Sequence, residues 1–157
     1  TTEIYLFPYT TLFRSVAEEF DTRSVAAPAP TERGVVPHLI LIIGRSRINT
    51  IVVSKIVERC GMRHICVSPE EGEAVLLKTS PILAILDGGS DNRDCEALMR
   101  PLRQRRAEAS RMLPAVILLS TSALRRDTVD AIVAKPILPE VLQPVVSRLA
   151  ARPPPQG

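Results

Sequence analysis

Short apolar runs alternate with amphipathic stretches between residues 37 and 150 of the chain. A short continuous apolar run is typical of a strand buried on both faces of a parallel sheet, whereas an apolar stripe at helical spacing is typical of a helix packed on that sheet. The runs predict strands at residues 39–43, 64–67, 81–86, 115–119 and 131–134. The amphipathic stretches predict helices at residues 46–59, 69–78, 91–109 and 139–150.

Glycine and proline positions refine these helices. Gly61 follows the first helix and suits a left-handed C-terminal cap, and Pro69 suits the first turn of the second helix. Pro101 lies inside the third predicted helix, where it predicts a kink or a break. Pro144 lies inside the last helix and predicts that this helix is bent or shortened.

Strands that alternate with helices predict a doubly wound α/β fold with a five-stranded parallel sheet. The strand order that we expect is the flavodoxin-like order 2-1-3-4-5, in which ligands meet the sheet at the carboxyl ends of its strands. Candidate functional residues should therefore lie at Gly44 and Arg45, at Asp87, and at the ends of the fourth and fifth strands.

Residues outside 37–150 are not expected to contribute to this fold. The segment LFPYTTLFRS, at residues 6–15, resembles the translation of a common DNA-sequencing adapter, so we interpret residues 1–15 as an artefact. We expect an N-terminal extension without fixed structure over residues 1–36, because AAPAP and scattered charges follow this segment. One domain over residues 37–150 and a disordered tail, ARPPPQG, over residues 151–157 complete the expected organisation.

The composition limits how the core is built and which partners are expected. Hydrophobic residues make up 45% of the chain and aromatic residues only 3%, so the core must consist of aliphatic side chains. The longest apolar stretch is too short to span a bilayer, so we expect no membrane partner. The net charge is +3, and arginines gather at residues 100–111 and 125–126 without neighbouring aromatics. We interpret these arginines as a solvated helix face and expect no nucleic-acid partner.

The cysteines and histidines do not form a recognisable site. Cys60, Cys66 and Cys95 show no CxxC spacing and no paired histidines, which argues against a zinc site or a disulfide framework. We expect these cysteines to pack as small apolar groups, and we expect the isolated His38 and His64 to have no catalytic role. No secretory signal is visible, so the expected compartment is the cytoplasm.

Three polar residues follow strands that should meet at one edge of the sheet. Asp87 follows the third strand in AILDGG, and Ser120 ends the fourth strand in VILLST. Lys135 precedes Pro136 after the fifth strand in AIVAKPI. This series resembles the receiver domain of bacterial two-component response regulators, and the resemblance covers residues 37–150.

The resemblance implies a role for each of these residues. It implies that Asp87 accepts a phosphoryl group from a histidine kinase, that Ser120 hydrogen-bonds a phosphoryl oxygen, and that Lys135 forms an ion pair with the same group. It also implies Mg²⁺ as a cofactor, because a divalent cation helps to neutralise the charge that develops as an acyl phosphate forms.

Three features depart from the receiver pattern. The acidic pair that helps receivers to bind Mg²⁺ maps onto Gly44 and Arg45, which leaves Asp87 as a weak Mg²⁺ site. Ile132 stands where the family often has an aromatic side chain that changes rotamer on activation. The segment TSALRRDTVD after Ser120 is too short for the usual fourth helix, so we predict a shortened one.

Arg45 suggests a substitute for the metal. A guanidinium close to Asp87 would form an Arg45–Asp87–Lys135 cluster in which the carboxylate is already paired. We expect such a cluster to hold the site in one state and to make phosphorylation of Asp87 slow or absent.

The residues lead to three functional hypotheses, of which two are signalling modules and one is a domain that binds a small molecule. The first is a single-domain receiver in phosphorelay signal transduction, a binding module rather than an enzyme. Its partners would be a sensor histidine kinase or phosphotransfer protein and a downstream protein target. The second is a pseudo-receiver, a protein-interaction module that works without phosphorylation. A flavodoxin-like domain that binds a nucleotide or a flavin is the third, and the scarcity of aromatic residues argues against a flavin.

Each of these site residues also has an alternative interpretation in which it has no functional role. Asp87 could be a loop residue that caps the next helix, Ser120 a polar strand terminus, and Lys135 a surface lysine.

Overall fold

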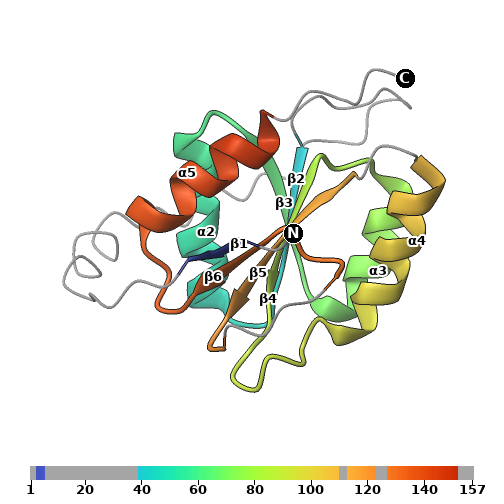
Figure 1. Ribbon diagram of the computed structural model, residues 1–157, viewed down its shortest axis with the longest axis horizontal. Helices are drawn as coiled ribbons and strands as arrows, with labels where there is room; N and C mark the ends of the chain where they lie inside the picture. Colours follow the sequence, from blue (N-terminus) through green and yellow to red (C-terminus); the bar gives the residue numbers. More distant parts are fainter. Residues whose placement is uncertain (1–2, 6–38, 110–112, 123–126, 152–157) are drawn as a thin grey trace.

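A six-stranded sheet with helices on both faces forms the centre of the computed structural model (Figure 1). The structure describes residues 3–5, 39–109, 113–122 and 127–151. In their order across the sheet, the strands are β1 (Glu3–Tyr5), β6 (Ala131–Ala134), β5 (Ala115–Ser120), β4 (Leu83–Asp87), β2 (Leu39–Ile43) and β3 (Arg63–Val67). All neighbouring strands are parallel. Strands β2 to β6 follow the predicted order 2-1-3-4-5, which confirms the flavodoxin-like fold.

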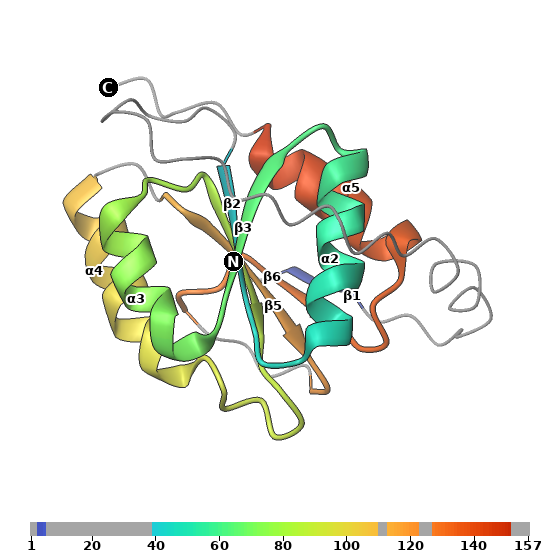
Figure 2. The ribbon, with the colours of Figure 1, turned by 180° about the vertical axis from the view of Figure 1, so that it is seen from behind.

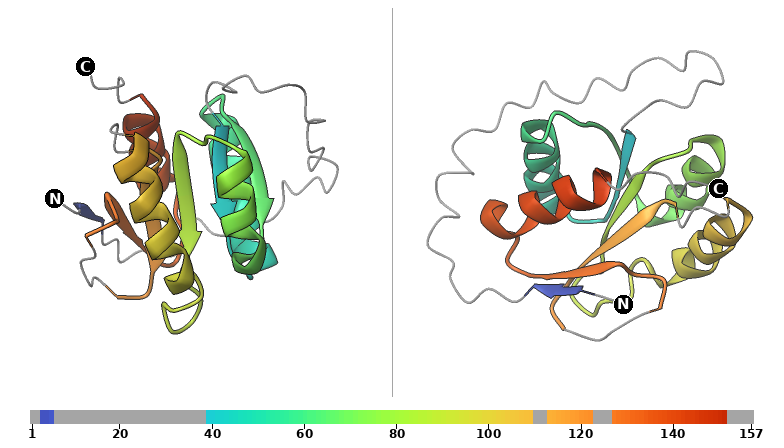
Figure 3. Two further views of the ribbon diagram at one scale, coloured as in Figure 1. Left: turned by 90° about the vertical axis from the view of Figure 1, so that its right-hand side faces the viewer. Right: turned by 45° about the horizontal axis from the view of Figure 1, so that its top comes forward.

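The helices divide between the two faces of the sheet. One face is covered by α2 (Arg47–Arg59) and α5 (Pro139–Ala150), and the other by α3 (Pro69–Lys78), the 3₁₀ helix η1 (Glu96–Leu98) and α4 (Met99–Ala109). Figures 2 and 3 show the same layers from other directions.

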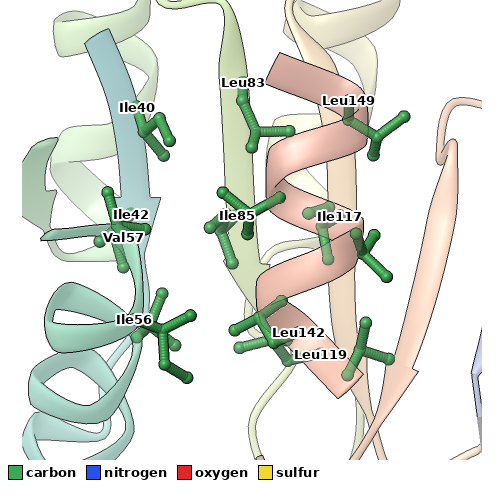
Figure 4. Close-up of a cluster of buried hydrophobic side chains, with 14 of the residues drawn as sticks. Ile40, Ile42, Ile56, Val57, Leu83, Ile85, Ile117, Leu119, Leu142 and Leu149 are labelled. Carbon is green, nitrogen blue, oxygen red and sulfur yellow. The ribbon is translucent and has the colours of Figure 1, made fainter. Parts of the chain in front are cut away.

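Alternate residues of each strand pack against opposite helix layers. In β4, Leu83 and Ile85 belong to the cluster beneath α2 and α5, which Figure 4 shows in close-up. Ala84 and Leu86 of the same strand belong to the cluster beneath α3 and α4. All five residues of β4 are buried, as expected for a central strand covered on both faces.

Residues 3–5 form a strand within the N-terminal segment that the sequence predicts to lack fixed structure. Glu3–Tyr5 pairs with β6 in parallel, with Glu3 opposite Ala131 and Tyr5 opposite Val133. Without β1, strand β6 would be the edge of the sheet and would present unpaired backbone groups, which an extended segment can satisfy. The expectations for residues 6–36, including the adapter-like segment, and for residues 152–157 lie outside the described residues.

The helix boundaries agree with the sequence at most ends. Helix α2 begins at Arg47, one residue after its N-cap Ser46, and α3 occupies the predicted residues 69–78. Gly61 adopts a φ of 73°, as its place after α2 predicts. Helix α5 runs to Ala150 with Pro144 inside it, so of the two predicted effects, a bend or a shortening, the shortening does not occur. The buried residues on its inner face stabilise this helix against the loss of one backbone hydrogen bond.

The predicted helix over residues 91–109 is wrong in its first part. The chain forms a loop after β4, and helical structure begins only at Glu96. Asn92 has a φ of 63°, a left-handed conformation that is incompatible with a helix and that asparagine tolerates better than most residues. The helical segment changes from η1 to α4 between Leu98 and Met99, close to Pro101.

The described residues between β5 and β6, 121–122 and 127–130, form no helix. This agrees with the prediction of a shortened fourth helix, since few residues remain between the two strands. Within the part of the chain that the structure describes, no helix combines the length and the apolar character that a bilayer span requires.

Candidate functional site

Asp87 is the last residue of β4, and its carboxylate lies at the carboxyl edge of the sheet with only 5% of the residue exposed. Each carboxylate oxygen has donors. Lys135 Nζ lies 2.5 Å from Oδ1, and the backbone N–H of Gly89 donates to the same oxygen at 3.0 Å. Asn49 Nδ2 donates to Oδ2 at 2.8 Å. A buried charge is thus paired and hydrogen-bonded on both oxygens.

Lys135 is held in place by more than its ion pair. Its backbone N–H donates to the carbonyl of Ser120 at 3.0 Å, and its Nζ donates to the carbonyl of Gly89 at 2.9 Å. The Lys135–Pro136 peptide bond is cis. These contacts place the ammonium group beside Asp87, so Lys135 is not the exposed surface lysine of the alternative interpretation.

Burial and pairing act in opposite directions on the Asp87 carboxyl group. Burial raises the pKa of Asp87, whereas hydrogen bonds from Lys135, Asn49 and Gly89 lower it. The hydrogen bonds and the nearby ammonium prevail, so the pKa of Asp87 lies below its usual range. The carboxylate is therefore ionised at neutral pH, which is the form that can act as a nucleophile.

Arg45 does not join this cluster, contrary to the expectation from the sequence. Its guanidinium forms an ion pair with Glu70 at the start of α3, and its side chain is 59% exposed. The predicted Arg45–Asp87–Lys135 cluster is therefore wrong for Arg45, whereas its Asp87–Lys135 pair is present. Lys135 already balances the buried charge, and a second cation would lose its hydration there without a second anion to offset the loss.

Gly44 packs directly against Asp87. A Cβ atom at Gly44 would lie 2.8 Å from the Cβ atom of Asp87, which is closer than carbon atoms approach without displacement. The absence of a side chain at position 44 is thus required by the close approach of the end of β2 to Asp87, and an acidic residue does not fit there in this backbone arrangement.

Ser120 lies at the same edge of the sheet, at the end of β5, but its hydroxyl is engaged by Asn92. Ser120 Oγ donates to Asn92 Oδ1 at 2.9 Å and accepts from the backbone N–H of Ser122 at 3.1 Å. Asn92 Oδ1 also accepts from the backbone N–H of Thr121 at 2.9 Å. Asn92 therefore ties the loop after β4 to the end of β5.

The remaining candidate side chains have no role at the site. Cys95 is buried, its thiol donates to the carbonyl of Asp87 at 3.2 Å, and burial raises its pKa to about 12, so it is not a nucleophile. Burial lowers the pKa of His64, which lies in β3. Burial also raises the pKa of Cys66, which contacts Ser54 at 3.1 Å. His38 lies outside the described residues.

Sequence reasoning missed two asparagines that shape the site. Asn49 lies in the first turn of α2. Asn92 lies in the loop after β4 with a φ of 63°, a conformation that asparagine tolerates without any functional reason. A signal for Asn49 existed, since a residue in the first turn of the helix after the first strand faces the carboxyl edge. Nothing in the sequence pairs Asn92 with Ser120.

The residues around Asp87 do not fit a magnesium ion. Mg²⁺ prefers octahedral oxygen ligands with one or two carboxylates among them, and here nitrogen donors engage both oxygens of the carboxylate. The positions that carry the acidic pair in receivers hold Gly44 and Arg45. Within the described residues, no group of three or more His, Cys, Asp or Glu side chains is arranged to hold a metal. Charge compensation at Asp87 therefore falls to Lys135.

Comparison with known proteins places this geometry in a structural context. No protein-family model and no curated protein sequence matches the chain. Solved structures do match. The signal receiver domain of a signal transduction histidine kinase from Syntrophus aciditrophicus is 27% identical, with a TM-score of 0.60, and the match covers 76% of this chain and 97% of that one.

Two further structures show the range of similar proteins. The receiver domain of the sensor histidine kinase PA1611 from Pseudomonas aeruginosa, described with a magnesium ion in its active-site cleft, is 19% identical at a TM-score of 0.58 and covers 72% of this chain and 97% of its own. The pseudo-receiver domain of the CikA protein is 20% identical at a TM-score of 0.58 and covers 74% of this chain and 98% of its own. The chain thus has the fold of response-regulator receiver domains, as its motifs predicted.

Proposed function

We propose that this protein is a receiver module in phosphorelay signal transduction and that Asp87 is its phosphoryl acceptor. The contact between Lys135 Nζ and Asp87 Oδ1, at 2.5 Å, carries the proposal. It supports an ionised carboxylate next to a fixed ammonium group at the ligand-binding edge of a doubly wound sheet. Ser120 at the end of the neighbouring strand adds a hydroxyl group at the same edge.

The proposed reaction is a phosphoryl transfer to the carboxylate. An oxygen of Asp87 attacks the phosphorus atom of a phosphohistidine; the O–P bond forms as the P–N bond breaks, and the electron pair of that bond leaves with the imidazole. Lys135 compensates the negative charge on the transferred group, and the hydroxyl of Ser120 can donate to one of its oxygens once it releases Asn92. With one ammonium group as the cation, we expect this transfer to be slow.

The partners proposed for this function are proteins. A sensor histidine kinase or a phosphotransfer protein would supply the phosphohistidine, and a downstream protein would recognise the modified form. Two of the similar structures are receiver domains of histidine kinases, which supports this class of donor.

The test is the reaction of the purified protein with acetyl phosphate, followed by intact mass spectrometry. We expect slow addition of one phosphoryl group, at a rate that added Mg²⁺ changes little. The Asp87→Asn variant should show no addition. The matched control is Asp91→Asn, which removes an exposed acid from the same loop and should be labelled like the unmodified protein. Labelling that persists in Asp87→Asn would place the acceptor elsewhere.

A second candidate function is that of a pseudo-receiver, an interaction module that needs no phosphorylation. The observation that favours it is the pairing of both Asp87 oxygens by Lys135, Gly89 and Asn49 in a site without an acidic pair. Under this function, neither acetyl phosphate nor a histidine kinase labels the protein. Its affinity for a protein partner is then the same before and after incubation with the phosphodonor.

A further inference from the structure

Asn49 occupies a well-anchored position beside Asp87. It is the third residue of α2, and its backbone N–H donates to the side chain of the N-cap Ser46 at 3.3 Å. Its side-chain Nδ2 reaches across to β4 and donates to Asp87 Oδ2 at 2.8 Å. The helix start therefore fixes an amide group against the oxygen that Lys135 does not contact.

The two residues that follow β2 do not bond the Asp87 carboxylate, which leaves this contact to Asn49. Gly44 has no side chain, and a Cβ atom there would collide with Asp87. Arg45 turns outward to Glu70. In the described part of the chain, Asn49 is the residue of the β2–α2 junction whose side chain bonds the carboxylate.

A divalent cation at this carboxylate would meet three obstacles. Lys135 already neutralises the single negative charge, so little attraction remains for a second cation. The side-chain N–H group of Asn49 donates to Oδ2 of Asp87, and a metal ion would have to displace it. If the amide turned over, it would offer a neutral oxygen and lose its hydrogen bond, whereas hard cations gain most from charged ligands.

We propose that Asn49 closes Asp87 to divalent cations, and that the residue at position 49 decides whether this site takes a metal. An amide at this position donates to the carboxylate and excludes the ion. A carboxylate at the same position would supply the second acid that positions 44 and 45 do not provide. This inference concerns the metal alone and holds whether or not Asp87 is phosphorylated.

The experiment is a titration with Mn²⁺ alone, with free Mn²⁺ measured by electron paramagnetic resonance. The proteins compared are the full chain, Asn49→Asp, the double variant Asn49→Asp with Asp87→Asn, and Ile48→Asp. Ile48 is the matched control, since it precedes Asn49 in the same helix turn and is 63% exposed. It receives the same added charge without contact to Asp87. Circular dichroism checks that each variant is folded.

We expect the unmodified protein to show no saturable Mn²⁺ binding that depends on Asp87. Asn49→Asp should bind Mn²⁺ at least about tenfold more tightly than the unmodified protein, because two carboxylates then face one ion. Mn²⁺ should also raise the melting temperature of Asn49→Asp and leave that of Ile48→Asp unchanged. The double variant should lose the gain.

Three outcomes would overturn the proposal. The first is saturable Mn²⁺ binding to the unmodified protein that disappears in the single variant Asp87→Asn, which is titrated alongside the others; this result decides the matter even if Asn49→Asp fails to fold. The second is an equal gain in Ile48→Asp, which would assign the effect to general charge. The third is a folded Asn49→Asp that binds no more tightly than the unmodified protein. The labelling of Asp87 by acetyl phosphate and its loss in Asp87→Asn do not depend on these outcomes, so the two proposals fail separately.

Discussion

At the scale of single residues, Asp87 shows how a buried carboxylate stays ionised. The residue is 5% exposed, and an unpaired charge at this depth would be protonated instead. One ammonium group and two neutral donors, from three separate segments of the chain, replace the lost water. The charge at the site therefore depends on the fold, and the stability of the fold depends in turn on the charge.

This coupling predicts a pH dependence of stability. Because the pKa of Asp87 is lower in the folded protein than in the unfolded chain, its contribution is fully present above the unfolded pKa and is lost as the pH falls through the folded pKa. The free energy of unfolding of the unmodified protein should exceed that of Asp87→Asn at neutral pH. The difference should shrink as the pH is lowered below the pKa of an aspartate in the unfolded chain, about 3.9. Urea unfolding at a series of pH values measures it.

The control for this prediction is Asp91→Asn, because Asp91 is exposed in the same loop. The difference between this variant and the unmodified protein should stay nearly constant with pH. Parallel pH profiles for Asp87→Asn and the unmodified protein would mean that the ion pair with Lys135 contributes nothing to the folded state.

At the scale of elements, α4 is attached to the sheet by a buried arginine. Arg106 is 6% exposed; its Nη1 donates to the carbonyl of Thr128 at 2.6 Å, and its Nη2 pairs with Asp130 Oδ1 at 3.2 Å. Asp130 Oδ2 accepts from the backbone N–H of Val116 at 2.8 Å. The interpretation of residues 100–111 as a solvated arginine face is thus wrong for Arg106. This side chain joins α4 to the short connection between β5 and β6.

Removing this guanidinium should destabilise the protein strongly. Arg106→Met leaves the Thr128 carbonyl without its donor and Asp130 without this cation, and it should lower the free energy of unfolding by about 3 kcal/mol. Arg103→Met changes an exposed residue of the same helix and should stay within about 0.5 kcal/mol of the unmodified protein. Urea unfolding at neutral pH compares the two. Equal effects would mean that the buried contact adds nothing to an ordinary helix substitution.

The elements also show what the sequence can predict. The helix over residues 69–78 and the strands over residues 39–43 and 131–134 have the predicted boundaries, since an apolar run or a first-turn proline marks each of them. The sequence predicts a helix around Asn92, where the structure has a loop. The left-handed conformation of Asn92 goes with contacts to β5, which lies far away in the sequence, so the local pattern could not indicate it. The burial of Arg106 could not be predicted for the same reason, because its partners Thr128 and Asp130 are brought to it by the fold. Asn49 differs, since its place in the first turn of α2 was a usable signal.

At the scale of the whole molecule, the carboxyl edge collects residues from distant segments into one site. The order of parallel strands brings Asp87, Ser120 and Lys135 to this edge. Their places at the ends of three strands, together with the resemblance to receiver domains, predicted this convergence. The direction of the Arg45 side chain could not be predicted in this way. It depends on the competition between Asp87 and Glu70 for one cation, and only the positions of both carboxylates decide it.

The contribution of β1 to the molecule can be measured by removing residues 1–36. Strand β1 pairs only with β6 in the described sheet, and the strands that surround the two hydrophobic clusters all lie after residue 38. The shortened chain should therefore fold cooperatively and lose no more than about 1 kcal/mol of unfolding free energy, since a few edge hydrogen bonds are offset by the ordering of their segment. Ile4→Pro in the full chain, which removes a backbone donor opposite Ile132, should have a similarly small effect. In hydrogen exchange, both changes should speed the exchange of β6 amides and leave β4 amides protected. A shortened chain that fails to fold would show that the domain needs β1 and does not begin near residue 37.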